Sequence, residues 1–235
     1  MPAITVRLAC YLIVVGIVST STSAASILAE DNKFRIYGAS SNQAEAVCRV
    51  LIRAKAFFAN CGITQTVPVD IHIVGQLRGD FENALLGTCS PSEGRIELLS
   101  RADFRERLVE DGALAVIPPK ELYDSFIVHE LAHALYFQTV NGKPQCRAAN
   151  EYIASSMQIA FLTEESRDAF LDSFGPLPDG SLDRFNEFVL ALDPLTFSAN
   201  AYLHFIRPEN GCQFIRQVIS REVTFPDASR RRSYQ

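Results

Sequence analysis

Two histidines and a glutamate in one short stretch are the residues of this chain that point most clearly to chemistry. The sequence reads His129-Glu130-Leu131-Ala132-His133, an H-E-x-x-H motif. On an α-helix, residues four apart lie about 40° apart around the axis and about 6 Å apart along it, so both imidazole rings can bind one metal ion. Glu130 can reach a water molecule on that metal without being a ligand. The motif therefore predicts a metal site in which Glu130 acts on water.

The stretch around the motif has the signals of a helix from Pro118 to Thr139. A proline pair opens it, and proline in a first turn loses no intrahelical hydrogen bond. The dipeptide Asn141-Gly142 follows and indicates a helix stop. Apolar residues recur at spacings of three and four in register with both histidines, which predicts that the histidines face the interior. This stripe consists of Leu122, Phe126, His129, His133 and Phe137.

A catalytic zinc site needs three protein ligands besides water, and the motif supplies two. Glu151 lies eighteen residues after His133, within the sequence N-E-Y-I-A and near the start of an expected helix. The connection between the two helices carries a glycine and a proline, so the chain can reverse and bring Glu151 back to the metal. Glu164 and Glu165 are competing carboxylates in a more charged segment. A solvated or capping position is the alternative for Glu151.

The combination of HELAH with a downstream NEYIA resembles the gluzincin metallopeptidases, the thermolysin-like and aminopeptidase-like group. Their pattern is H-E-x-x-H on one helix and N-E-x-x-A or N-E-x-x-S on the next. The resemblance implies that His129, His133 and Glu151 bind one zinc ion and that Glu130 is the general base. It covers about Pro119–Leu162 and implies a compact zincin-like core.

One position departs from the thermolysin-like pattern. Those enzymes carry an aspartate four residues after the ligand glutamate, and it orients the first histidine. This chain has Ser155 at that position. Because a carboxylate behind a ligating histidine fixes its tautomer and basicity, three alternatives arise. Ser155 does this more weakly, Asp124 or another acid replaces it, or activity is reduced.

Peptide hydrolysis also needs a hydrogen-bond donor for the tetrahedral oxyanion. Tyr202 and His204 are the candidate catalytic residues, and packing or a surface position is the alternative for each. Because they are two residues apart, only one of them can face the cleft from a helix. Ala201-Tyr202 followed by Gly211–Ile215 resembles, less specifically, the tyrosine-bearing helix late in compact gluzincins. For the substrate, Gly94–Ser100 is our candidate for an exposed sheet edge with which an extended peptide can pair.

Residues 1–25 have the organisation of a secretory signal. Arg7 supplies the positive charge, Leu8–Val18 an apolar core of eleven residues, and Ser23-Ala24-Ala25 a small-residue cleavage site. Eleven apolar residues are too few to span a bilayer, so we expect an exported protein, periplasmic or secreted, without stable membrane insertion. An uncleaved anchor is the alternative, because no charge occurs from Leu8 to Ala29.

Composition excludes some classes of partner and of chemistry. The formal net charge of the chain is −5, and it becomes −6 once the signal with Arg7 is removed, so there is no electrostatic basis for binding nucleic acid. No C-x-x-C motif occurs, which argues against cysteine zinc ligation. An oxidising compartment outside the cytoplasm favours disulfides. Five cysteines follow the signal, and they allow at most two disulfides, whose pairing the spacing leaves open: Cys48, Cys61, Cys89, Cys146 and Cys212.

Periodicity predicts an α+β chain in which strands precede a mainly helical part. Before the motif helix we expect three strands, at Phe34–Ala39, Val67–Val74 and Gly94–Ser100. We also expect a helix at Asn42–Asn60, a loop at Gly87–Ser92 and a short charged helix at Arg101–Asp111. After it we expect only helices: Arg147–Thr163, Ser166–Phe174, Ser181–Leu192, Ala199–Ile206 and Gly211–Ser220. Together with the gluzincin resemblance, which implies a zincin-like fold, this order indicates a single domain at 26–235, with an α/β lobe at 26–140, a helical lobe at 141–229 and a tail at 230–235.

The leading hypothesis is an exported zinc-dependent peptidase that hydrolyses peptide bonds with one Zn²⁺ and with Glu130 as general base. Its expected partner is a peptide or protein substrate, and no oligomeric state is assigned. The first alternative is a catalytically silent zinc-binding or interaction module of the periplasm or extracellular space. The second is a structural exported domain without metal.

Overall fold

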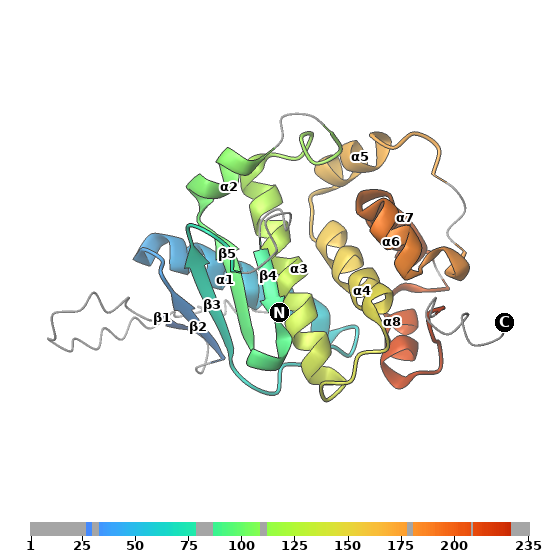
Figure 1. Cartoon of the computed structure of the whole chain (residues 1–235), viewed down its shortest axis with the longest axis horizontal. Helices are drawn as coiled ribbons and strands as arrows, with labels where there is room; N and C mark the ends of the chain where they lie inside the picture. The colour runs from blue at the N-terminus through green and yellow to red at the C-terminus, as the bar shows by residue number, and fades with distance from the viewer. Residues whose placement is uncertain are drawn as a thin grey trace, which may run out of the picture.

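The computed structural model describes residues 27–29, 33–78, 87–108, 112–177, 181–207 and 209–226. Figure 1 shows a small sheet on one side and a group of helices on the other, with helix α3 (Pro119–Thr139) between them. The expected organisation, a small mixed sheet followed by a mainly helical part, is confirmed. The predicted signal at 1–25 and the tail at 230–235 lie outside the described residues, and the lobe boundary at residue 140 stays a prediction.

The sheet has five described strands in the order β1-β2-β3-β5-β4. Their bounds are β1 (Ile27–Ala29), β2 (Phe34–Tyr37), β3 (Val69–Val74), β4 (Gly87–Ser90) and β5 (Arg95–Leu99). The three central strands are parallel, while β1 and β4 pair antiparallel with their neighbours. Along β3 the expected alternation is confirmed, since Val69, Ile71 and Ile73 are buried. His72 lies on the opposite, polar face, stacked on Tyr37 and away from the motif helix.

Two expectations about the sheet are wrong. Gly87–Ser92 is not a loop throughout, because its first four residues form β4. These residues show no alternation of apolar and polar side chains, so the strand depends on its antiparallel pairing with β5. Gly94–Ser100 does contain a strand, but β5 lies between β3 and β4 and is therefore not an edge. The outer strand of the described sheet on this side is β4.

Helix α3 is the central element of the packing. It contacts α1 (Ser41–Ala59), α2 (Arg101–Arg107) and the strands β4 and β5 on one side, and α4 (Arg147–Ala160) on the other. The sequence predicted one buried stripe, whereas residues around nearly the whole circumference are buried because neighbours surround the helix. They include Leu122, Tyr123, Ile127, Val128, Leu131, Ala134 and Tyr136.

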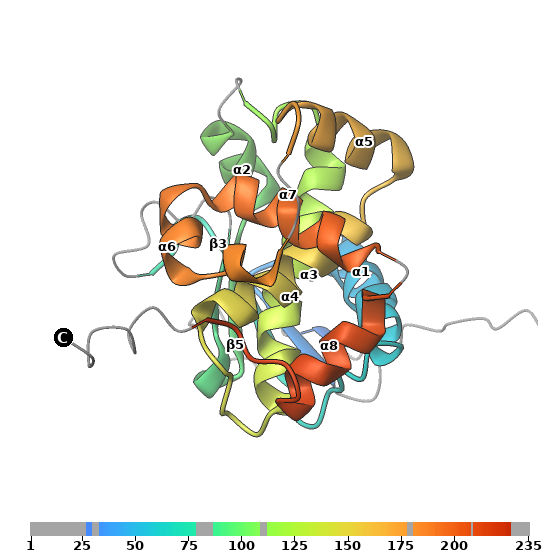
Figure 2. The same cartoon turned by 90° about the vertical axis from the view of Figure 1, so that its right-hand side faces the viewer.

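The second half of the described chain is helical. After α4 come α5 (Glu164–Asp172), α6 (Glu187–Leu192), α7 (Pro194–Phe205) and α8 (Gly211–Ser220). Figures 1 and 2 show that α4 runs back alongside α3 and that α7 crosses the opposite side of α4, where the two helices pack closely. Within the described residues, no helix is long and apolar enough to cross a membrane.

At two of the helix boundaries that differ from expectation, a capping side chain explains the difference. Ser181–Leu192 is not one helix but a 3₁₀ turn at Leu182–Arg184 followed by α6. The break occurs at Asn186, whose side-chain oxygen accepts hydrogen bonds from the first backbone N–H groups of α6. Helix α7 begins at Pro194 rather than Ala199, because Asp193 accepts a hydrogen bond from the N–H of Thr196 and caps an earlier start.

A disulfide joins Cys61, just after α1, to Cys212 in α8. It closes a loop of 151 residues and ties the N-terminal helix to the last described helix. Closing so long a loop restricts the unfolded chain strongly, which is the usual source of disulfide stabilisation. The sequence indicated disulfides but left this pairing open.

A glycine between β2 and α1 allows a close approach of two backbone segments. Gly38 has a φ of 74°, and a Cβ atom there would collide with the carbonyl oxygen of Ile73. Gly175 has a similar φ of 64°, but no atom of the described residues lies within 4 Å of its Cβ position.

We therefore expect Gly38→Ala to lower the free energy of unfolding more than Gly175→Ala does. The left-handed backbone costs each alanine about 1–2 kcal/mol. The collision with Ile73 adds at least about 1 kcal/mol for Gly38 only. Urea denaturation followed by circular dichroism measures both variants, and equal losses would contradict the close approach.

Candidate metal centre

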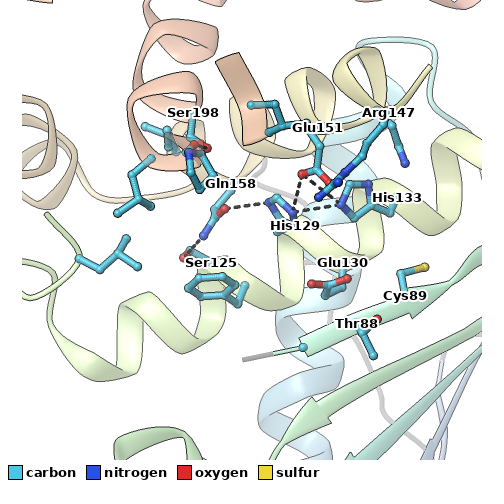
Figure 3. Close-up of a pocket in the computed structure, with 18 of the residues that line it drawn as sticks. Thr88, Cys89, Ser125, His129, Glu130, His133, Arg147, Glu151, Gln158 and Ser198 are labelled. Atoms are coloured by element: carbon cyan, nitrogen blue, oxygen red, sulfur yellow. Dashed lines mark hydrogen bonds and ion pairs between the residues drawn. The ribbon is translucent and has the colours of Figure 1, made fainter. Parts of the chain in front are cut away.

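Three side chains from α3 and α4 converge on one point. Nε2 of His129 lies 3.0 Å from Nε2 of His133. One carboxylate oxygen of Glu151 lies 3.5 Å from the first of these nitrogens and 3.7 Å from the second. Figure 3 shows the two rings and the carboxylate turned toward one another. The three residues form a group that can hold a metal ion.

The spacing of these atoms fits a small divalent cation. Zinc binds imidazole nitrogen and carboxylate oxygen at about 2.0–2.2 Å in tetrahedral geometry, which places any two ligand atoms about 3.4 Å apart. The three separations of 3.0, 3.5 and 3.7 Å scatter around that value. The donor set, two imidazoles and one carboxylate, is that of catalytic zinc sites, which leave a fourth position for water.

The chain reversal between α3 and α4 brings Glu151 to the histidines. Helix α3 ends at Thr139, and Asn141 and Gly142 follow with φ of 52° and 73°, so the expected helix stop is confirmed. Helix α4 begins at Arg147, one turn before Glu151, and packs along α3. The competing carboxylates Glu164 and Glu165 lie instead in the exposed first turn of α5.

A glutamine orients the first histidine. Nδ1 of His129 lies 2.9 Å from the side-chain oxygen of Gln158. The amide of Gln158 donates to Ser125 Oγ at 3.2 Å, and Ser125 donates to the carbonyl of Leu122. Because an amide oxygen only accepts hydrogen bonds, Nδ1 of His129 carries a proton, which leaves Nε2 as the nitrogen that can bind a metal ion.

Gln158 therefore takes the place of Ser155 and Asp124, the two residues that the sequence suggested for orienting His129. Ser155 bonds to Ser198 at 2.9 Å rather than to His129. Asp124 forms ion pairs with Arg101 and Lys120. Nδ1 of His133 is buried and has no hydrogen-bond partner among the described residues.

Glu130 is buried between α3 and the edge strand β4, as Figure 3 shows. It has room because Gly87 has no side chain: a Cβ atom there would lie 3.1 Å from Cγ of Glu130. Burial raises the pKa of Glu130 to about 7, with His133 opposing the shift and Glu151 adding to it. A carboxyl with a pKa near neutrality can both take and return a proton at physiological pH.

Glu151 has the opposite electrostatic environment. Burial alone would raise its pKa, but the hydrogen bond with His129 and the charges of His133, His129 and Arg147 outweigh burial and lower the pKa to about 2. Glu151 is therefore ionised, which is the form that binds a metal ion.

The structure does not bring Tyr202 or His204 to this centre. Neither lines the cavity that contains the three ligands. Nδ1 of His204 lies 2.7 Å from the hydroxyl of Tyr152, inside a cluster of aromatic rings, and Arg167 lies over the ring of Tyr202. Their predicted role as oxyanion donors has no support from this geometry.

The cavity around the candidate ligands has a volume of about 750 Å³. Its polar lining includes Arg147 and Gln158, which the sequence reasoning missed. Their spacing in the sequence could have indicated both, since Arg147 lies four residues before Glu151 and Gln158 seven residues after it, on the same helix face. The apolar lining of the cavity includes Phe126, Ile159, Leu162, Phe170 and Leu195.

Fold and site together define a class of protein, an α+β chain in which a histidine pair on one helix and a glutamate on the next can hold a metal ion. The chain belongs to a family of unknown function, DUF6639, whose model matches residues 34–228. The matched region contains the whole candidate metal centre. Comparison with curated proteins and with solved structures gives no match.

The role of Gln158 in orienting His129 can be tested by comparison with Ser155, the position that the thermolysin-like pattern would favour for this role. Gln158→Leu removes the acceptor behind His129 and should weaken zinc binding about 10- to 100-fold. Ser155→Ala should leave zinc affinity within about threefold, because Ser155 contacts Ser198 instead. Zinc competition with a chromophoric chelator measures both, and Gln158→Glu should restore binding. A larger loss for Ser155→Ala would contradict the assignment.

Proposed function

We propose that this protein is an exported zinc-dependent peptidase with a gluzincin-like, and therefore zincin-like, core. The observation that carries the proposal is the convergence of His129, His133 and Glu151 at 3.0–3.7 Å, with Glu130 buried beside them. A purely structural metal site would be expected to close the fourth position with another protein ligand. Among the described residues the group has three members and opens into a cavity.

In the proposed reaction, zinc would lower the pKa of a water molecule and polarise the scissile carbonyl. Glu130 would accept the proton of the attacking water on a carboxylate oxygen and pass it to the leaving amine. Its burial between α3 and β4 holds the carboxylate in one place. Gln158 would keep the proton of His129 on Nδ1 throughout, so that Nε2 stays available as a ligand.

The edge strand β4 gives a peptide substrate a place to bind. It is the outer strand of the described sheet, and Thr88 and Cys89 line the cavity beside Glu130. An extended peptide that pairs with β4 would lie across the metal centre with its scissile bond near Glu130. We therefore assign peptide pairing to β4 rather than to Gly94–Ser100, the segment suggested from the sequence, which contains the inner strand β5.

The apolar end of the cavity supports a substrate with a large hydrophobic side chain. Phe126 lies one turn before His129 on α3, Ile159 lies at the far end of α4, and Leu162 follows just after that helix. The volume of about 750 Å³ is in the range of pockets that enclose small molecules or several side chains. Burying one leucine or phenylalanine side chain there would contribute about 1.5–3 kcal/mol to binding.

Export is supported by two independent features. The signal predicted at 1–25 would direct the chain out of the cytoplasm. The disulfide between Cys61 and Cys212 is of the kind that persists in oxidising compartments, such as the periplasm or the extracellular space.

The alternative is a catalytically silent zinc-binding or interaction module. It is favoured by one observation, that neither Tyr202 nor His204 lines the cavity as an oxyanion donor. Such a module would keep the same three ligands but would not cleave peptides.

The Glu130→Gln variant tests the proposal. It should bind one zinc ion per chain, because the three ligands are unchanged, and it should fail to cleave peptides, because an amide cannot accept the proton. Elemental analysis gives the stoichiometry, and mass spectrometry of a digested mixture of denatured proteins gives the cleavage. Glu164→Gln is the matched control on the exposed start of α5 and should keep both properties.

Each further outcome selects another hypothesis. Cleavage by Glu130→Gln rejects Glu130 as the base. A wild-type protein that binds zinc but does not cleave, with or without chelator, is the silent module. A wild-type protein without stoichiometric zinc is a structural domain.

A further inference from the structure

Arg147 places a positive charge beside the candidate metal centre. It is the first residue of α4, lies one turn before Glu151 and lines the cavity. Figure 3 shows it on the side of Glu151 and His133, while Gln158 lies beyond His129 on the other side. On a helix with a rise of 1.5 Å per residue, Arg147 is about 6 Å from Glu151 along the axis.

The lining of the cavity therefore changes along α4, from the charged Arg147 at one end to the apolar Ile159 at the other. Along α4, Arg147 lies at one end, Glu151 follows, and Ile159 lies about 18 Å from Arg147 along the axis. Ile159 and, on α3, Phe126 place apolar lining at that far end. A substrate that spans the centre would thus meet a guanidinium on one side and a hydrophobic recess on the other.

The guanidinium of Arg147 has no carboxylate partner within ion-pair distance in the described part of the chain. Glu187 is close to the start of α4, but its carboxylate accepts a hydrogen bond from the backbone N–H of Arg147 at 3.3 Å. Arg147 is also exposed, so its side chain is not a structural group enclosed by the core. This leaves its donors available to a ligand.

Charge balance in the loaded site favours an anion at this position. A divalent ion would offset the negative charges of Glu130 and Glu151. Asp193, a further acidic residue of the cavity lining, is engaged as the cap of α7. The charge of Arg147 would then remain, next to the positive N-terminal end of α4.

We propose that Arg147 binds a carboxylate of the substrate, within about two residues of the scissile bond. Two residues of extended peptide span about 6.6 Å, which is close to the rise of about 6 Å along the axis of α4 from the Cα atom of Arg147 to that of Glu151. Arginine suits this task because its planar fork of donors matches a carboxylate in a bidentate pair. The inference rests on the proposed function and adds a substrate class to it, peptides with a carboxylate on one side of the cleaved bond and a hydrophobic residue on the other.

The test uses zinc-loaded protein and two readouts. Cleavage sites of a peptide library are compared between wild type and Arg147→Ala. Binding of short peptides is measured by fluorescence anisotropy on Glu130→Gln with and without Arg147→Ala, using peptides that carry Asp, Asn or Lys at each position. The binding arm does not require catalysis, so it separates a failed peptidase from a failed inference.

We expect wild-type cleavage to be enriched at sites near a carboxylate and Asp peptides to bind about tenfold more tightly than their Asn counterparts. Arg147→Ala should abolish both preferences while zinc affinity stays within about threefold. Arg147→Glu should reverse them in favour of Lys. Lys143→Glu makes the same change of charge on an exposed turn before α4 and should alter neither.

A second arm separates the two sources of carboxylate. Libraries with free and with amidated C-termini are compared. Loss of the preference on amidation assigns Arg147 to the terminal carboxylate, and retention assigns it to Asp and Glu side chains.

The outcomes distinguish this inference from the proposed function. If wild type does not cleave but Asp peptides still bind through Arg147, the peptidase proposal fails and the carboxylate site stands. If Asp and Asn peptides bind alike, or if Arg147→Ala keeps the preference, the carboxylate site is rejected, whether or not the protein cleaves peptides.

Discussion

The site depends on three lone-pair-bearing atoms that face one another across the junction of α3 and α4. Two imidazole nitrogens 3.0 Å apart and a carboxylate oxygen within 3.7 Å of both would repel one another in their deprotonated forms unless positive charge lies between them. A metal ion would supply that charge, and a shared proton would supply part of it. The protein holds these atoms together through the packing of two helices, so the geometry of the site is a property of the core.

That packing explains why α3 is so deeply enclosed. A helix that carries two candidate ligands must not rotate if they are to face the third, because a rotation of one residue, about 100°, would take the histidines away from Glu151. Burial around most of α3, with the sheet, α1 and α2 on one side and α4 on the other, prevents this. Gln158, Ser125 and Leu122 add a chain of hydrogen bonds between the same two helices.

Burial also separates the two acids of the site. Glu130 is buried beside strand β4, so its pKa rises to about 7, whereas Glu151 lies against two imidazoles and near Arg147, so its pKa falls to about 2. Two identical functional groups thus acquire different tasks from their surroundings. One suits proton transfer, and the other suits permanent ligation.

Local patterns in the sequence were sufficient for the candidate ligands. H-E-x-x-H with a proline pair before it and Asn141-Gly142 after it predicted α3, its limits and the approach of both rings, because all of these depend on neighbours along one helix. Glu151 followed from the reversal between two helices. The strand β4 did not follow, since four residues without apolar alternation become a strand only when β5 lies beside them.

What the sequence by itself determined is therefore the set of residues that can meet across one helix turn, and with it the candidate chemistry. Only the tertiary structure decided which side chains from distant segments stand behind and beside them. Gln158 rather than Ser155 orients His129, and Arg147 rather than Tyr202 or His204 lines the cavity. The physical reason is that α7 packs against α4 so that His204 meets Tyr152 inside the aromatic cluster, a contact between segments 52 residues apart that no local spacing reveals.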